Sequence, residues 1–158
     1  MTLYTIINNL CGISSLTALL ESSDLYKSKT PPMGTHKINY SSIVAHDIVY
    51  EVTDDNSYLV GFADDKNEPK EYVIVERALE FDEQDIKLGM DSYYFEYSDQ
   101  SNSGYGLCSK VVIRQNEIVF SVKHKYADDI TSITVSYKDN AIEDIKEHRT
   151  MLSNIFGD

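Results

Sequence analysis

The sequence predicts an α+β fold in which an antiparallel β-sheet, built from consecutive hairpins, is packed by an N-terminal and a C-terminal helix. Three observations lead to this prediction. Apolar residues recur at helical spacing near both ends of the chain, they alternate at strand spacing in between, and clusters of turn-forming residues separate the strands. The chain has 158 residues, which is enough to bury one core without disulfides or a structural metal.

The N-terminal part is predicted to contain a short strand at Leu3–Ile7 and a helix over residues 13–26, in which Leu16, Leu19 and Leu20 share one face. The helix is expected to end at Lys27–Gly34, because two consecutive prolines and a glycine there favour a linker. We therefore divide the chain into an N-terminal helical arm and linker, residues 1–35, and an α+β domain, residues 36–158. The two parts are expected to form one compact unit.

The strand-like pattern begins after the linker. Ile43–Thr53 and Tyr58–Ala63 flank the turn cluster Asp54–Ser57, so this segment is predicted to form a β-hairpin. A longer turn is expected over Asp64–Lys70. In Glu71–Phe81, Tyr72 and Ile74 alternate with Val73 and Val75, a pattern typical of a strand that is buried on both faces for part of its length.

The second half of the chain continues the series. A strand is predicted at Ser92–Tyr97, a polar loop at Ser98–Gly104, a hairpin from Tyr105–Arg114 and Glu117–Lys123, and a last strand at Thr131–Tyr137. The C-terminal helix is expected to start after a cap at Asp139 or Asn140. Its apolar positions repeat at helical spacing and are Ile142, Ile145, Leu152, Ile155 and Phe156.

Residues 82–94 are the most informative stretch between the strands. Asp82 is predicted to cap a short helical turn, with Asp85 as its third residue, and Gly89 is expected to end the turn with a left-handed backbone. In this arrangement Ile86 and Met90 face the core and Lys87 points outward. The pattern is explained as a capped connection between two strands, without any function.

The net charge is concentrated in one third of the chain. Residues 47–99 hold 16 carboxylates against 4 lysines or arginines, which gives the whole net charge of −12, because the rest of the chain has 10 acids and 10 bases. Such a surface attracts a positively charged partner and repels nucleic acid. The chain also has 12 tyrosines, a residue type suited to protein interfaces. Both features point to a protein partner.

Candidate catalytic and metal-binding patterns are weak. Asp54–Asp55 and Asp64–Asp65 are compatible with metal ligands or an acid/base pair, but turn chemistry explains them better. The tetrapeptide Tyr126–Asp129 has the letters of a polymerase metal site without its context. The four histidines are scattered, and Lys123–Tyr126 is too short for a nucleic-acid footprint. We predict no catalytic residue, no metal and no cofactor.

The location of the protein is predicted from its first residues and its cysteines. The first 20 residues are fairly apolar but contain no lysine or arginine, so the basic start of a signal peptide is missing, and polar residues interrupt any membrane span. Cys11 and Cys108 lack metal-ligand spacing; two free thiols are favoured, with a disulfide between them left open. These observations predict a soluble, cytoplasmic protein.

Three segments of the chain form a recognisable combination. They are Asp82-Glu83-Gln84-Asp85, Leu88-Gly89-Met90-Asp91-Ser92-Tyr93, and Tyr105-Gly106 with the hairpin after it. With these segments the chain resembles the immunity protein 10 family of bacterial polymorphic toxin systems. Leu107 stands where the family has a second glycine. The resemblance extends from about Ile43 to the final helix and so makes residues 36–158 an immunity-protein-like domain, with the first 35 or so residues as an added element.

The resemblance implies a small cytoplasmic protein that binds and neutralises a cognate toxin domain, as in contact-dependent inhibition. The charge adds the expectation of a basic toxin, such as a nuclease, masked at its active or substrate-binding site. Carboxylates would steer and pair with the toxin, and tyrosines would anchor it. The predicted contact residues are Asp54, Asp55, Tyr58, Asp64, Asp65, Glu68, Asp82, Glu83, Asp85, Asp91, Tyr93 and Tyr94.

Two other classes of function stay open from the sequence. One is a protein-binding adaptor module unrelated to toxins. The other is a small enzyme whose carboxylates converge only in the folded structure. We expect the partner of the protein to be neither a nucleic acid nor a membrane, and the sequence leaves the oligomeric state open.

Overall fold

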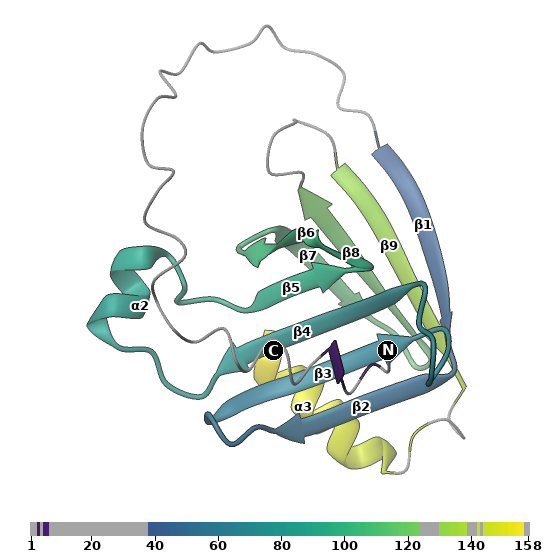
Figure 1. Ribbon diagram of the computed structural model, residues 1–158, viewed down its shortest axis with the longest axis horizontal. Coiled ribbons are helices and arrows are strands. Elements are labelled where there is room, and N and C mark those ends of the chain that lie inside the picture. The colour runs from purple at the N-terminus through teal and green to yellow at the C-terminus, as the bar shows by residue number, and fades with distance from the viewer. Residues whose placement is uncertain are drawn as a thin grey trace, which may run out of the picture.

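The structure is a computed structural model of the chain, and it describes residues 3, 5, 6, 38–123, 130–138, 142 and 144–156. Figure 1 shows the arrangement of the strands and helices. Their bounds are β1 (Ile38–Ala45), β2 (Asp47–Val52), β3 (Ser57–Ala63), β4 (Tyr72–Ala78), α2 (Glu83–Leu88), β5 (Tyr94–Tyr97), β6 (Asp99–Tyr105), β7 (Cys108–Ile113), β8 (Glu117–Lys123), β9 (Ile130–Tyr137) and α3 (Ile145–Phe156).

The strands form two sheets and not the single antiparallel sheet that the sequence predicts. One sheet has four strands in the order β1-β9-β8-β7, and the other has five in the order β2-β3-β4-β5-β6. All neighbouring strands are antiparallel except β1 and β9, which are parallel. The expected hairpins β2–β3 and β7–β8 are confirmed.

The change of sheet occurs at His46, inside the segment predicted as one strand over Ile43–Thr53. Ile43 and Ala45 are buried in the core before this point, whereas Ile48 and Tyr50 face the same core after it. The alternation therefore shifts by one residue at His46, and a shift of one residue turns the opposite side of a strand toward the core. The backbone N–H of His46 donates to the carbonyl oxygen of Ala63 at 2.9 Å, which starts the pairing of β2.

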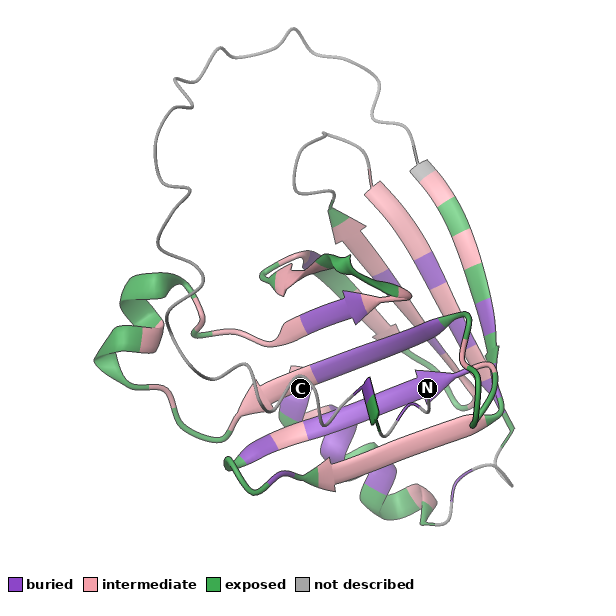
Figure 2. Cartoon of the chain, in the orientation of Figure 1, coloured by how far each residue is buried: buried purple, intermediate pink, exposed green. Residues whose placement is uncertain are grey.

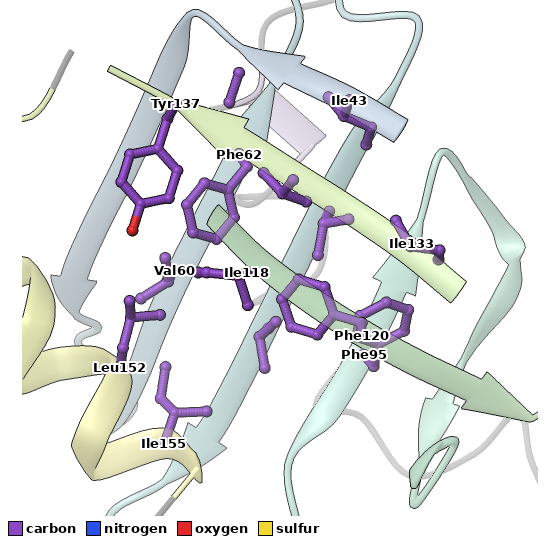
Figure 3. Packing of buried hydrophobic residues seen from close by; sticks show 14 of the residues in the cluster. Ile43, Val60, Phe62, Phe95, Ile118, Phe120, Ile133, Tyr137, Leu152 and Ile155 are labelled. Carbon is purple, nitrogen blue, oxygen red and sulfur yellow. The ribbon is translucent and has the colours of Figure 1, made fainter. Parts of the chain in front are cut away.

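The main core lies between the two sheets and is closed on one side by α3. Figure 3 shows apolar side chains from both sheets and from α3 meeting in one cluster, with Phe95 of β5 beside Phe120 of β8. The ring centroids of Phe95 and Phe120 are 5.3 Å apart, and those of Phe120 and Phe156 are 5.9 Å apart. Phe120 thus joins both sheets to the C-terminal helix.

A second, smaller core covers the other face of β3 and β4. Leu3 and Ile6 pack there against a group of strand residues that comprises Leu59, Ala63, Tyr72 and Ile74. This explains why most of β3 and the first four residues of β4 are buried in Figure 2, and it confirms the prediction that part of Glu71–Phe81 is buried on both faces. The prediction of a short strand at Leu3–Ile7 is wrong, because residues 3, 5 and 6 are helical. The helix predicted over residues 13–26 lies outside the described residues.

Two further boundaries differ from the sequence prediction. Residues 98–104, expected as a polar loop, belong largely to strand β6, because Ser98 with φ 52° makes the turn alone. The C-terminal helix starts later than expected: the carboxylate of Asp144 accepts from the N–H groups of Lys146 and Glu147 at 2.9 and 3.0 Å. Asp139 and Asn140, the predicted caps, lie outside the described residues.

Candidate functional site

The predicted contact residues separate into two groups at opposite ends of the five-stranded sheet. The β2–β3 turn carries Asp54 and Asp55, and α2 follows the end of β4 that pairs with the start of β3. The β3–β4 loop with Asp64, Asp65 and Glu68 lies at the other end of β3, seven residues away, or about 20 Å at strand spacing. In Figure 1 these ends lie on the left and on the right. We call residues 53–57 and 76–91 the α2 end.

Helix α2 has the local structure that the sequence predicts. The Asp82 carboxylate accepts from the N–H groups of Gln84 and Asp85 at 2.7 and 2.9 Å, while the Asp85 carboxylate accepts from the Asp82 N–H at 3.0 Å. Gly89 has φ 70° and ends the helix. The expected burial of Ile86 is wrong: its side chain is 58% exposed, and that of Leu88 is 55% exposed. A six-residue helix at the sheet margin has no core beneath it, so it presents apolar side chains to solvent.

A small hollow lies between α2 and the outer face of the five-stranded sheet. Its lining includes Glu76 and Asp85 with Ser57, Met90 and Tyr105. Burial raises the pKa of the Glu76 carboxyl, and the charge of Asp55 raises it further, although a hydrogen bond from Ser57 acts in the opposite direction. Burial and the charges of Glu76 and Asp85 raise the pKa of Tyr105. The hollow is therefore a site of negative potential.

A buried carboxylate organises the tyrosines on this same face. Glu96 is 1% exposed, and its two oxygens accept from the hydroxyls of Tyr72 at 2.7 Å and Tyr94 at 2.6 Å. Burial and these bonds raise the pKa of both tyrosines. The Tyr94 ring packs edge-on against Tyr105, with centroids 5.6 Å apart. Tyr94, predicted as a contact residue, is thus held in place by Glu96.

Tyr58 and Tyr93, also predicted as contact residues, lie partly buried against the main core. The Tyr93 hydroxyl donates to the carbonyl oxygen of Cys108 at 3.1 Å, and its ring packs edge-on against Phe156. Cys108 is a buried free thiol whose pKa is raised by burial. Cys11 lies outside the described residues.

The β3–β4 loop confirms the interpretation of its aspartates as turn residues. Asp65 accepts from the N–H groups of Asn67 and Glu68 at 2.8 and 2.9 Å, and these bonds lower its pKa. Asp64 accepts from the N–H groups of Lys70 and Glu71 at 3.0 and 3.2 Å. Within residues 38–123 and the other described positions, no group of three or more His, Cys, Asp or Glu side chains could hold a metal ion.

Sequence reasoning missed the part of the site that depends on strand register. Glu76, Glu96 and Tyr105 were not among the predicted contact residues. Glu76 pairs with Tyr94, which in turn pairs with Tyr105, so these side chains share one face of the sheet. A sequence signal for this shared face does exist. Ile74 and Glu76 in β4, and Tyr94 and Glu96 in β5, are each two residues apart and so point to one face of their strand. Only the register of the two strands shows that these two faces coincide.

The cap of α2 gives a first testable prediction. Asp82→Ala is expected to lower the free energy of unfolding by about 1 kcal/mol, because two N–H groups lose their acceptor. Asp82→Asn removes the same charge but keeps an acceptor oxygen, so its loss in the free energy of unfolding is expected to be only a few tenths of the loss for Asp82→Ala. Urea denaturation of the three proteins measures the difference; equal losses for both variants would contradict a capping role.

No helix in the described part of the chain is long and apolar enough to cross a membrane.

Exposed apolar side chains of α2 beside a dense set of carboxylates are suited to contact with another macromolecule, and the fold behind them is a two-sheet α+β domain. These features define the class of the protein: an acidic α+β domain with a surface suited to protein binding.

The family follows from comparison with known proteins. The chain belongs to the Immunity protein 10 family, whose model matches residues 44–143, more than half of its length. Immunity proteins neutralise toxins, so the partner of such a protein is a toxin. Comparisons with curated proteins and with solved structures give no match.

Proposed function

We propose that this protein acts in the cytoplasm of the producing cell and neutralises a basic toxin domain, a nuclease, by binding it through the α2 end. The binding would cover the toxin's active or substrate-binding site and needs no chemistry from the immunity protein itself. The observation that carries the proposal is the concentration of carboxylates at this end. They comprise Asp54, Asp55, Glu76, Glu80, Asp82, Glu83, Asp85 and Asp91.

The cations among these residues do little to neutralise the carboxylates. The Arg77 guanidinium donates to the carbonyl oxygens of Asn154 and Ile155 at 3.2 and 3.0 Å, so its charge is directed toward α3. Lys87 lies 3.7 Å from Glu83 in a solvent-exposed ion pair, which contributes little energy. The negative electrostatic field of the carboxylates at the α2 end therefore persists, and it favours rapid association with a positively charged surface.

The α2 end also offers contacts that act at short range. Ile86 and Leu88 provide exposed apolar surface beside the carboxylates. A lysine or arginine of the toxin placed at the hollow would pair with the carboxylates of Glu76 and Asp85 that line it, and it would offset the repulsion between Glu76 and Asp55. A nuclease presents such basic side chains where it binds phosphates. The proposed complex therefore blocks the groups that the toxin needs for its substrate.

The test compares two double charge reversals with the same total change of charge. Asp55→Lys with Glu83→Lys changes the α2 end, and Glu68→Lys with Glu71→Lys changes the opposite end of the sheet; all four side chains are exposed. The α2-end variant is expected to weaken binding of the cognate toxin domain by about 100-fold at low salt, mainly through slower association. The control variant is expected to change it by less than about threefold, a residual long-range effect.

The measurement is association kinetics at several salt concentrations, together with the toxin's nuclease activity and the growth of cells that express it. Equal effects of the two variants would show that overall charge, and not the α2 end, governs binding. A wild-type protein that neither binds the neighbouring toxin domain nor rescues growth would overturn the proposal as a whole.

A further inference from the structure

Strand β1 differs from the other three edge strands of the two sheets. Exposed edges invite pairing with another chain, and proteins usually protect them with charges or bulges. The strand β2 carries Asp47 and Glu51. Strand β6 begins with Asp99 and pairs through a register shift at Glu96/Tyr97, and β7 carries Lys110 and a shift next to it. Strand β1 has eight residues without a charge, a proline, a glycine or a register shift.

Among the described residues, the backbone of β1 is paired along one side only. It forms a parallel ladder with β9 from Ile38 to Ala45, and it is the last strand of its sheet. In a parallel ladder, alternate peptide groups of each strand point away from the neighbour. Within the described part of the chain, no backbone–backbone hydrogen bond outside the strand ladders involves residues 38–45; the Ile43 carbonyl oxygen also accepts from the Ser136 hydroxyl of β9 at 3.3 Å. Figure 1 shows β1 at the outer margin of the molecule, on the side opposite α2.

The exposed side chains of β1 have a self-complementary order. Tyr40 is 80% exposed and Val44 is 55% exposed. Ser42 lies midway between them and is exposed, and all three point to the same face because strand side chains alternate. A two-fold axis through Ser42 would place Tyr40 of one copy opposite Val44 of the other, and the reverse. Aromatic and β-branched side chains are a favourable cross-strand pair.

Charge distribution allows two copies to meet at this edge although each has a net charge of −12. Strands β1 and β9 contain no charged residue at all. The other two strands of the sheet carry Lys110, Lys123 and Glu117, so the four-stranded sheet is weakly positive overall. The carboxylates of the α2 end lie on the far side of the molecule. Strand β1 itself therefore adds no charge repulsion between two copies, and the carboxylates of Asp47 and Asp65 lie beyond its C-terminal end at Ala45.

We infer that β1 is the interface of a homodimer in which two β1 strands pair antiparallel about an axis at Ser42, joining two four-stranded sheets into one. The dimer leaves both α2 ends open to solvent, so each copy can bind its own partner. The interface is small, and its dissociation constant is expected to be on the order of micromolar.

The test measures the mass of the full chain in solution by sedimentation over a dilution series, without any toxin. Wild-type protein is expected to shift from dimer to monomer on dilution. Ser42→Lys places two ammonium groups opposite each other at the axis and is expected to raise the dimer dissociation constant at least about 100-fold. Thr134→Lys is the matched control. Residue 134 pairs with Ser42 on the same face, one strand inside the edge, and its variant should remain dimeric.

A cross-linking experiment tests the register. Ser42→Cys is expected to give a disulfide-linked dimer on mild oxidation, whereas Thr134→Cys is not. A wild-type protein that is monomeric at every concentration would overturn the inference. So would a Ser42→Lys variant that loses toxin binding while the wild type stays monomeric, because β1 would then accept a strand of the toxin. These masses are measured without toxin, so their outcome is separate from that of the proposed function.

Discussion

Lowering the pH from 7 to 4 is expected to remove about 3 kcal/mol of the free energy of unfolding through His148 alone, at 1.36 kcal/mol per unit of pKa shift. His148 lies on α3 and is fully buried. Its ring meets the rings of Tyr50, Phe62 and Tyr137 edge-on, with centroids 5.5, 5.8 and 5.6 Å away, and neither ring nitrogen has a hydrogen-bond partner among the described residues. Burial, and to a lesser degree the charge of Arg149, lowers its pKa from 6.5 to about 4.

The direction of the effect follows from proton binding in the two states. In the unfolded chain, His148 takes up a proton as the pH falls through 6.5, whereas in the folded protein it does so only near pH 4. The unfolded state binds more protons in this window, so the stability is fully present above pH 6.5 and is lost as the pH falls toward 4.

The measurement is urea denaturation of wild type and of His148→Phe between pH 7 and pH 4. Carboxylates contribute to acid sensitivity in both proteins, so the difference between the two curves isolates the histidine. His46→Gln, which removes an exposed histidine, is the control for the loss of one imidazole. If the free energy of unfolding falls with pH as steeply in His148→Phe as in the wild type, His148 is not the cause of the loss.

Phe120→Ala is expected to lower the free energy of unfolding by about 3–5 kcal/mol, the usual cost of removing a buried phenylalanine ring. Phe120 is 0% exposed and touches rings from both β5 and α3. Its removal should weaken the joint between the two sheets. The loss is a large share of the 5–15 kcal/mol that stabilise a typical domain.

Val119→Ala is the matched control for Phe120→Ala. Val119 precedes Phe120 in β8 and points to the outer, only partly buried face of the sheet, so its truncation should cost less than about 1 kcal/mol. Urea denaturation followed by two spectroscopic probes gives both values. One cooperative transition is expected in each protein, and two separate transitions for Phe120→Ala would show that the sheets unfold independently.

The sequence predicted those features that depend on neighbouring residues. The cap at Asp82, the left-handed Gly89 and the turn roles of Asp64 and Asp65 all rest on bonds within a few residues, and the structure confirms them. The family resemblance is confirmed as well. The buried central strand was predicted because its four successive apolar residues need cover on both faces.

Long-range pairing was harder to predict. The parallel contact between β1 and β9 joins residues that are far apart in the sequence, and no local pattern indicates it. The break at His46 did leave a signal in the shifted alternation of Ile43, Ala45, Ile48 and Tyr50. Ile86 was misplaced because apolar character alone does not show whether a core lies beneath a short helix. The hollow at Glu76 depends on the register of three strands, which the sequence does not supply.

Two adjacent residues of β4 serve opposite sides of the sheet. Glu76 lines the hollow at the α2 end, and Arg77 reaches the last turn of α3 on the other side. Because side chains alternate along a strand, these two neighbouring residues have separate structural roles. A substitution at position 76 is therefore expected to change the hollow while it leaves the contact between Arg77 and α3 in place. Under the proposed function, new toxin specificities are expected to arise from substitutions on this face of β4, while the domain behind it stays the same.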